Sequence, residues 1–555
     1  MSAVIDAPAR GWARRRLASS ARPFTVAAGN SSLLRSQLAF GASWTAEAAF
    51  GVAIAVVAFR DGGAAAVGIV AFVLMAPSAL VVPIGSALAD RFPRDRVLIW
   101  SCIVRAGATL AATAVLIAGG SHIAVYALAV VSTAAFRLFR PIHTALLPSL
   151  CNTPFELRCA NVVRGVLNAV SALLGPLAAA LLLALSSPPL VFVAAATSAM
   201  VGLTYEASPR GRPQPLRRIA RETVEGFQAL RHHGDAGLVI GLSLVQTLTL
   251  GFLDVFVVVL ALDQLDMGDS GVGLLTAAMG AGALAASSLG ASTFANSRRL
   301  AALQGLGVVC FGIPLTLSGA FPYAPVVLAL MCVVGLGNAL VDTGLHTLPA
   351  RLVPEHLLAR VFGVKASLAG LSVAIGAFIT PFAIALLGVR GALAVLGLLA
   401  PAASALAWWR LRAIDEAIAQ RDDEIALLAS VRMFNPLPMP AIDNLALRVD
   451  SIEVAAASDV FTQGDHGDRF YVIEEGEADV IGDGRLICTL ESGDSFGEIA
   501  LLRDMGRTAT VRARTLLRLR RLERDEFCST VTCYASSERE ADTLVLDRLR
   551  AFAPA

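Results

Sequence analysis

Long apolar runs, each close to the thickness of a bilayer, recur through the first 410 residues of the chain. A helix needs about 20 apolar residues to cross a membrane. The runs form two groups of six, which are separated by a polar stretch. This pattern predicts an all-α membrane protein of twelve transmembrane helices in two six-helix halves, over 36–205 and 237–410. The runs lie at about 37–59, 64–88, 97–119, 122–147, 160–185 and 189–205, then at about 237–260, 271–294, 300–320, 324–348, 362–387 and 390–409.

Beyond the last apolar run, the spacing of apolar residues changes twice. Over 411–432 they lie on one helical stripe, which predicts a helical linker. A rigid coupling helix, a dimer seam and a solvated connection all fit this stripe. Over 433–555, a predicted helix at 440–447 precedes short strands broken by glycine turns. Ser537 and Glu540 form a capping box that would open a last helix. We therefore expect a small cytoplasmic β-roll domain with flanking helices.

Charge separates the same two parts of the chain. Residues 1–412 hold 29 Lys and Arg against 16 Asp and Glu, whereas residues 413–555 hold 16 against 27. Basic residues gather in the tail over 1–35, in the central loop over 206–236 and in the even-numbered gaps between runs. Cytoplasmic loops are enriched in arginine and lysine, so both termini should lie in the cytoplasm. We expect a multi-pass protein of the cell membrane, with the lipid bilayer as a partner.

The composition argues against an enzyme. Charged residues make up 16% of the chain, against about 25% in soluble globular proteins. The eight cysteines form no CxxC pair and have no histidine at zinc spacing, and there is no nucleophile–base pair or Walker-type loop. We expect no catalytic residue, no metal and no enzymatic cofactor, and an ion gradient as the energy source. No helix-turn-helix pattern follows the last predicted helix, so nucleic acid is not an expected partner.

The loop after the second run carries a motif, Gly-Ser-Ala-Leu-Ala-Asp-Arg-Phe-Pro-Arg-Asp-Arg over 85–96. Together with the two groups of six runs and the basic central loop, it resembles the signature loop of the major facilitator superfamily. The leading glycine stands one residue early. The resemblance covers 36–410 and implies a transporter. In that family the charged residues of this loop brace neighbouring helix ends, a gating role that falls here on Asp90, Arg91 and Arg94.

A second motif lies in the fifth run, where Gly175 and Pro176 stand among small residues. It resembles an incomplete form of the glycine–proline motif of antiporters that export drugs, in which only this glycine and this proline are kept. Small residues also let helices approach closely in any membrane bundle, so plain packing explains the pair as well. We expect an exporter whose mainly apolar pocket takes a hydrophobic or amphipathic small molecule.

Ionisable side chains inside the runs are costly, and they mark either a pathway or a buried pair. Carboxylates in this setting can carry protons. Glu47 and Asp254 occupy corresponding runs of the two halves, so we expect one of them to bind a proton or the substrate. A static pair with one of the arginines is the alternative, and the sequence does not choose the pairs. The candidates are Glu47, Asp254, Arg105, Arg137 and Asp342.

The C-terminal part carries the most specific pattern. It reads Gly-Asp-Ser-Phe-Gly-Glu-Ile-Ala-Leu-Leu over 493–502 and Gly-Arg-Thr-Ala-Thr-Val over 506–511. The pattern resembles the phosphate-binding cassette of cyclic nucleotide-binding domains, and the likeness spans 433–552. It implies that Arg507 clamps the cyclic phosphate through charge-assisted bonds. It also implies that Glu498 accepts a hydrogen bond from the ribose 2′-hydroxyl.

The same resemblance assigns smaller residues to the site. Gly497 lets the backbone approach the sugar. The amides of Ala500 and Thr508 would face the phosphate, with Ala509 beside them. Thr508 could reach a guanine amino group, but threonine also occurs in domains that prefer cAMP, so we expect cAMP ahead of cGMP. The cyclic nucleotide would act as a regulatory ligand.

Together these patterns predict a secondary active, proton-coupled transporter that is regulated by a cyclic nucleotide through the 411–432 helix. The alternative is a membrane-anchored cyclic nucleotide receptor or scaffold, in which the transporter fold moves no solute. The sequence leaves open the substrate, the direction of transport, the sign of the regulation and the choice between monomer and dimer.

Overall fold

The computed structural model describes residues 23–77, 94–151, 153–185, 187–200, 226–295 and 299–552. The chain divides into two compact units, Met1–Asp415 and Glu416–Ala555. Helix α13 (Glu355–Ser430) belongs to both units, since the boundary falls inside it. Within the described residues, the first unit contains helices and no strands, and every strand lies in the second unit.

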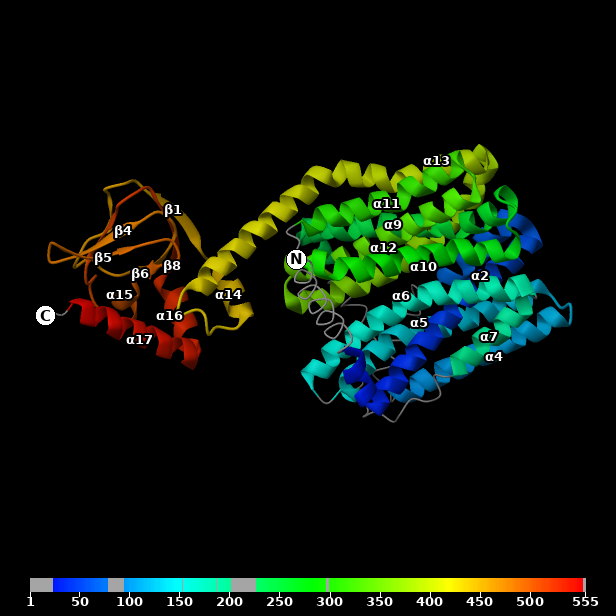
Figure 1. Ribbon diagram of the computed structural model, residues 1–555, viewed down its shortest axis with the longest axis horizontal. Coiled ribbons are helices and arrows are strands. Elements are labelled where there is room, and N and C mark those ends of the chain that lie inside the picture. Colours follow the sequence, from blue (N-terminus) through cyan, green and yellow to red (C-terminus); the bar gives the residue numbers. More distant parts are fainter. Residues whose placement is uncertain are drawn as a thin grey trace, which may run out of the picture. The chain divides into compact units, whose positions relative to one another are not determined.

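Long apolar helices make up the first unit (Figure 1). Within the described ranges, nine helices are long and apolar enough to cross a membrane. Two of them bend at glycines: α2 at Gly62 and Gly63, and α13 at Gly388. Gly63 and Gly388 have positive φ values of 60° and 68°, which suit glycine and interrupt a helix. The helical membrane fold is confirmed, and the number of twelve spans stays a prediction. The helices are α2 (Ser31–Met75), α4 (Arg94–Ile117), α5 (His122–Leu150), α6 (Pro154–Leu185), α7 (Pro188–Met200), α9 (Gly234–Val259), the π-helical turn η2 (Leu260–Gln264), α10 (Gly268–Ala295), α11 (Leu300–Ala320), α12 (Ala324–Leu352) and α13.

Glycines bring helices of the two halves into close contact. A Cβ at Gly280 of α10 would collide with the backbone of α6, and one at Gly273 would lie 2.6 Å from the carbonyl oxygen of Pro176. Gly175 approaches the backbone of Thr45 in α2 in the same way. Small residues at such crossings let membrane helices pack tightly. Gly175 therefore stands where close packing against α2 requires a small residue.

Polar contacts at helix ends add to this packing. Arg60 of α2 pairs with Asp269 at the start of α10, which joins the two halves. Asp415 of α13 accepts hydrogen bonds from the backbone N–H groups of Ala301 (2.7 Å) and Ala302 (2.8 Å). The first N–H groups of a helix have no partner within the helix itself. Asp415 therefore caps α11 and ties α13 to it.

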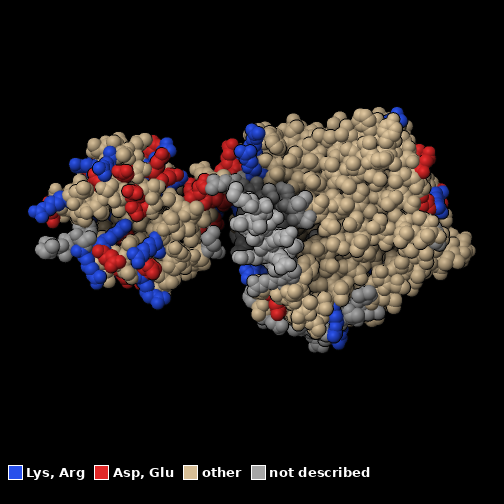
Figure 2. Space-filling view, viewed as in Figure 1, with Lys and Arg blue, Asp and Glu red and all other residues tan. Residues whose placement is uncertain are grey.

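The surface of the first unit is largely uncharged in the view of Figure 2. Large apolar side chains are exposed on this unit, among them Trp100, Ile117, Leu386 and Leu406. Water-soluble proteins rarely expose broad apolar surfaces. A lipid environment suits these side chains, so the unit is built to lie in a membrane.

The second unit contains two antiparallel sheets of four strands each (Figure 1). Their strand orders are β1-β8-β3-β6 and β2-β7-β4-β5. Tyr471, Val511 and Leu519 belong to the core that the two sheets share. This arrangement confirms a small β domain with flanking helices. Its elements are α14 (Met439–Ala446), β1 (Asp450–Val454), β2 (Asp459–Phe461), β3 (Arg469–Glu475), β4 (Ala478–Gly482), β5 (Arg485–Leu490), β6 (Ser495–Phe496), α15 (Glu498–Arg503), β7 (Thr510–Ala513), β8 (Leu517–Glu523), α16 (Arg524–Cys533) and α17 (Ala535–Phe552).

A second core joins the helices of this unit to β3. Phe434, Phe470 and Phe527 pack together, and the ring centroids of the last two lie 4.4 Å apart. Ser537 lies inside α17, and its hydroxyl donates to the carbonyl of Met433 at 2.6 Å. The expected capping box is therefore wrong, because this hydroxyl anchors α17 to the chain that precedes α14 and does not cap the helix.

Candidate functional site

The loop that is expected to gate transport falls at the edge of the described residues. Asp90 and Arg91 lie outside them. Arg94 is the first residue of α4, where the described chain resumes. The gating role of these three residues stays a prediction.

A cavity of about 320 Å³ lies between the two halves of the first unit. Helices α2 and α5 line it from the first half, and α9 and α10 line it from the second. Most of its side chains are apolar, and its polar ones include Glu47, Arg137, Asp254 and Thr276. An apolar pocket with a few converging polar groups is the usual form of a small-molecule site. Three residues that are far apart in sequence, Glu47, Arg137 and Asp254, thus meet around one cavity.

Glu47 is held in a buried ion pair. One of its carboxylate oxygens lies 3.0 Å from Nη2 of Arg105, and both side chains are largely buried. Arg105 also donates from Nη1 to the carbonyl of Ser43 at 3.0 Å, and its guanidinium lies 4.7 Å from the centre of the Phe136 ring. A buried charge is tolerated when it is paired and hydrogen-bonded. The structure thus shows Arg105 as the ion-pair partner of Glu47, and a role of Glu47 in transport stays a prediction.

Asp254 meets the cavity in a different way. It is exposed there, and no hydrogen bond or ion pair links it to another of the described residues. Arg137 donates from Nη2 to Sδ of Met75 at 2.7 Å. Asp342 is exposed on α12 and does not line this cavity among the residues that the structure describes. Asp254 therefore lines the cavity as an exposed carboxylate, whereas Glu47 lines it as part of an ion pair. Sequence reasoning missed Met75 and Thr276, because uncharged residues in an apolar run give no signal.

A second pocket, of about 90 Å³, lies in the second unit beside β6 and α15. Its lining includes the apolar side chains of Phe461 and Val511 and the charged side chains of Glu498, Arg507 and Arg548. The six residues that the sequence assigned to one ligand all meet here. They are Gly497, Glu498, Ala500, Arg507, Thr508 and Ala509.

Gly497 and Glu498 form the turn from β6 into α15. Gly497 has a φ of 94°, a left-handed conformation that favours glycine, and a Cβ there would lie 2.7 Å from Nη1 of Arg507. Glu498 is 1% exposed, and its Oε2 has no hydrogen-bond partner among the described residues. An unsatisfied buried acceptor is costly. This oxygen therefore keeps an acceptor position that the described residues do not fill.

Arg507 is a buried cation that is held by the backbone. Nη1 donates to the carbonyl of Gly497 at 2.9 Å, and Nη2 donates to the carbonyl of Arg469 at 2.8 Å. The guanidinium lies 4.1 Å from the centre of the Phe461 ring, within the range of a cation–π contact. These contacts fix its position beside the pocket but bring no negative charge.

The charge of Arg507 is poorly compensated. Burial lowers the pKa of its guanidinium, while Tyr471 and Asp468 act in the opposite sense. Asp468 lies 3.7 Å away, but its side chain is 58% exposed, so water screens it. Nε of Arg507 has no hydrogen-bond partner among the described residues. The pocket therefore presents a cation and an unsatisfied donor to an anion.

Arg548 is the charged pocket residue that sequence reasoning missed. It lies on α17, and its Nη1 donates to Oε1 of Glu498 at 2.7 Å. Arg539 and Arg550 on the same helix are exposed, so residue type alone did not single it out. Its spacing gives a signal, because it follows the buried Ala541 by seven residues and therefore falls on the inward face of α17.

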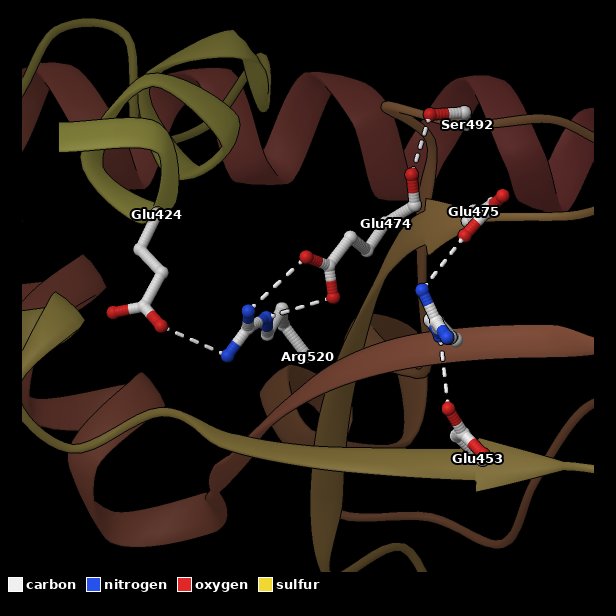
Figure 3. A network of polar contacts seen from close by, with 7 residues as sticks. Glu424, Glu453, Glu474, Glu475, Ser492 and Arg520 are labelled. Carbon is white, nitrogen blue, oxygen red and sulfur yellow. Dashed lines mark hydrogen bonds and ion pairs between the residues drawn. The ribbon is translucent and has the colours of Figure 1, made fainter. Parts of the chain in front are cut away.

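An ion-pair network joins the last part of α13 to the β-sheet (Figure 3). Arg520 of β8 donates two hydrogen bonds of 3.0 Å to Glu474 of β3, and one of 2.9 Å to Glu424 of α13. The side chains of Arg520 and Glu424 are largely buried. Strand β3 begins at Arg469, whose carbonyl accepts from Arg507. Arg520 of β8 therefore links Glu424 of α13 to β3, the strand whose first carbonyl accepts from the pocket arginine.

The second unit is similar to regulatory domains of known proteins. Residues 451–531 match the family model described as "Cyclic nucleotide-binding domain". The cAMP-dependent protein kinase regulatory subunit of Schizosaccharomyces pombe is 38% identical over 103 residues, which are 18% of this chain and 25% of the relative. That of Yarrowia lipolytica is 44% identical over 87 residues, 15% of this chain and 23% of the relative. The chain thus spans about a quarter of the length of these relatives.

The first unit compares with transporters. A crystal structure of a POT family transporter in complex with a thioalcohol conjugated peptide aligns with a TM-score of 0.56 at 13% identity, over 68% of this chain and 96% of that one. This similarity shows the fold alone. The family model described as "Major Facilitator Superfamily" matches residues 37–377, more than half of the chain. The chain therefore belongs to the Major Facilitator Superfamily, and it carries a C-terminal cyclic nucleotide-binding domain.

Proposed function

We propose that this protein is a proton-coupled secondary transporter that exports a hydrophobic or amphipathic small molecule, and that cAMP bound to its C-terminal domain sets the transport rate. The observation that carries the regulatory part is helix α13. The boundary between the two units falls inside this helix. On each side of the boundary, a side chain of the helix bonds to residues of its own unit. Asp415 caps α11 in the first unit, and Glu424 pairs with Arg520 in the second.

The cavity supports the transport part of the proposal. Its apolar walls suit a hydrophobic or amphipathic solute. Asp254 is exposed in it, and a carboxylate inside a membrane span is costly unless it has a role. Glu47 and its partner Arg105 would stabilise the bundle beside this site. The likeness of the Gly175–Pro176 motif to that of drug antiporters supports export as the direction.

The pocket of the second unit supports a cyclic nucleotide as its ligand. Arg507 supplies a buried positive charge and an unsatisfied N–H for a phosphate. Oε2 of Glu498 is free to accept from a ribose hydroxyl. The regulatory subunits matched above are named for their dependence on cAMP, which favours cAMP over cGMP. The arginine-rich loops favour a cytoplasmic position for both termini and for this domain, in a protein of the cell membrane.

Transport by purified protein in sealed vesicles tests the proposal. We expect proton-gradient-driven movement of lipophilic compounds whose rate changes when cAMP is added to the side that exposes the C-terminal domain. A domain that binds cAMP in a chain that moves no compound of the panel would favour a membrane-anchored receptor or scaffold. Transport that is identical with and without bound cAMP would refute regulation of the rate.

Replacing Arg520 with methionine should separate binding from regulation. Methionine keeps much of the apolar stem but leaves Glu474 and Glu424 without their shared cation. We expect the coupling between cAMP and transport to weaken by about 0.5–2 kcal/mol, or roughly 2- to 30-fold, with little change in cAMP affinity. Vesicle transport and calorimetry on the same preparation measure the two quantities.

Arg518→Met is the matched control for this experiment. Arg518 lies on the same strand and also bridges two carboxylates, those of Glu453 and Glu475, but it is half-exposed and touches no residue of α13 among its described partners. Its loss should leave both binding and regulation unchanged. Equal losses of regulation in the two variants would remove Arg520 from the coupling route.

A further inference from the structure

The two carboxylate oxygens of Glu498, a residue that lines the pocket, have different surroundings. Oε1 accepts a hydrogen bond from Nη1 of Arg548 at 2.7 Å. Oε2 has no donor among the described residues, although the side chain is only 1% exposed. Arg548 comes from α17, which lies 50 residues further along the chain. The buried carboxylate of Glu498 thus has a charged donor at Oε1 and no donor at Oε2.

This difference has a geometric consequence. The terminal torsion of a glutamate is soft, so a carboxylate without partners can turn through a broad range of angles. A charge-assisted hydrogen bond to one oxygen restricts that rotation and defines where the second oxygen points. Arg507 and Thr508 also line the pocket, but the side-chain hydrogen bond that the described residues make to Glu498 comes from Arg548. Arg548 is therefore placed to orient the carboxylate.

We propose that Arg548 is a positioning residue for ribose recognition. It holds Glu498 so that Oε2 receives the 2′-hydroxyl of a cyclic ribonucleotide, and it ties α17 to the acid that reads the sugar. The proposal rests on the cyclic nucleotide function proposed above and deepens it. The preference of the pocket for a ribose over a 2′-deoxyribose then depends on Arg548, which need not touch the sugar.

The test is calorimetry on the full chain in lipid nanodiscs, with cAMP and with 2′-deoxy-cAMP. In the Arg548→Ala variant we expect cAMP to bind about 5- to 30-fold more weakly, while 2′-deoxy-cAMP changes by less than about twofold. Arg548→Lys should restore part of the preference, because it keeps a charged donor. Arg550→Ala is the matched control, since Arg550 lies on the same helix and is 80% exposed. It should behave as the unaltered chain.

A double-variant cycle completes the test. In a Glu498→Ala background, the chain should no longer prefer cAMP over 2′-deoxy-cAMP, and adding Arg548→Ala should change neither affinity further. Equal weakening of both ligands by Arg548→Ala would mean that Arg548 only packs α17, which overturns the proposal. Tighter binding of both ligands would mean that the pair merely closes the pocket, and this also overturns it. An unaltered chain that binds neither ligand would instead refute the receptor function itself.

Discussion

Replacing Arg507 with alanine should weaken the binding of cAMP by the full chain about 30- to 1000-fold, which corresponds to about 2–4 kcal/mol. Arg507 is 4% exposed, and its guanidinium offers a positive charge and an Nε–H without a hydrogen-bond partner among the described residues. A phosphate bound there would lose a charge-assisted contact in a place that water reaches poorly. Calorimetry on the unaltered chain and the variant measures the effect directly.

Glu498→Ala should have the smaller effect of the two, about 1–3 kcal/mol, because it removes one hydrogen bond to a neutral hydroxyl. Arg507→Lys should fall between the unaltered chain and Arg507→Ala, since it keeps the charge but loses the donors that reach two carbonyls. Arg512→Ala is the control. Arg512 lies five residues further along the chain, on β7, and pairs with Asp459 at the surface, away from the pocket lining.

Stability must be followed in the same samples. Arg507 satisfies the carbonyls of Gly497 and Arg469, so its removal can loosen the turn into α15 even without a ligand. Thermal unfolding of each variant separates this effect from the loss of binding. A folded Arg507→Ala chain that binds cAMP as tightly as the unaltered protein would show that the pocket arginine does not hold the phosphate.

Much of the fold can be predicted from sequence patterns that allow few structural alternatives. Apolar runs of bilayer length leave few alternatives to helices, because every backbone polar group in lipid must be satisfied within the segment. The turn glycines of the second unit are equally informative, since Gly476, Gly484 and Gly497 all adopt positive φ values. The cassette residues could be found together because Gly497, Glu498 and Arg507 are close in sequence and lie on one short turn and one loop.

The pairing of charges could not be predicted in this way. Glu47 shares its half of the bundle with two candidate arginines, Arg105 and Arg137, and only the three-dimensional structure shows that Arg105 is its ion-pair partner. Ser537 was predicted wrongly for a different reason. Its local motif fits a helix cap, but its hydroxyl donates a tertiary hydrogen bond to the carbonyl of Met433. Arg548 combines both difficulties, since its partner lies 50 residues away and its neighbours on α17 include other arginines. Long-range polar contacts depend on the three-dimensional path of the chain, which local spacing does not encode.

Replacing Asp254 with asparagine should reduce proton-driven accumulation of solute by at least about tenfold, while leaving downhill movement of the same solute in place. Asparagine keeps the size and hydrogen-bonding capacity of the side chain but cannot bind and release a proton. Asp254 is the exposed carboxylate of the cavity between the halves. Asp342→Asn is the matched control, because this second carboxylate inside the helices of the second half lies outside the cavity lining. Vesicle assays with and without a pH gradient distinguish the two modes of transport.

Glu47→Gln should behave differently from Asp254→Asn, because Glu47 neutralises Arg105 at 3.0 Å. Breaking a buried ion pair by removing one partner costs about 3–5 kcal/mol, so this variant should unfold at a lower temperature and transport more slowly, yet keep its dependence on the gradient. If Glu47→Gln loses gradient dependence while Asp254→Asn keeps it, the proton passes through the Glu47–Arg105 pair and not through Asp254. A folded double variant, Glu47→Gln with Asp254→Asn, that still accumulates solute in full would remove both carboxylates from the coupling mechanism.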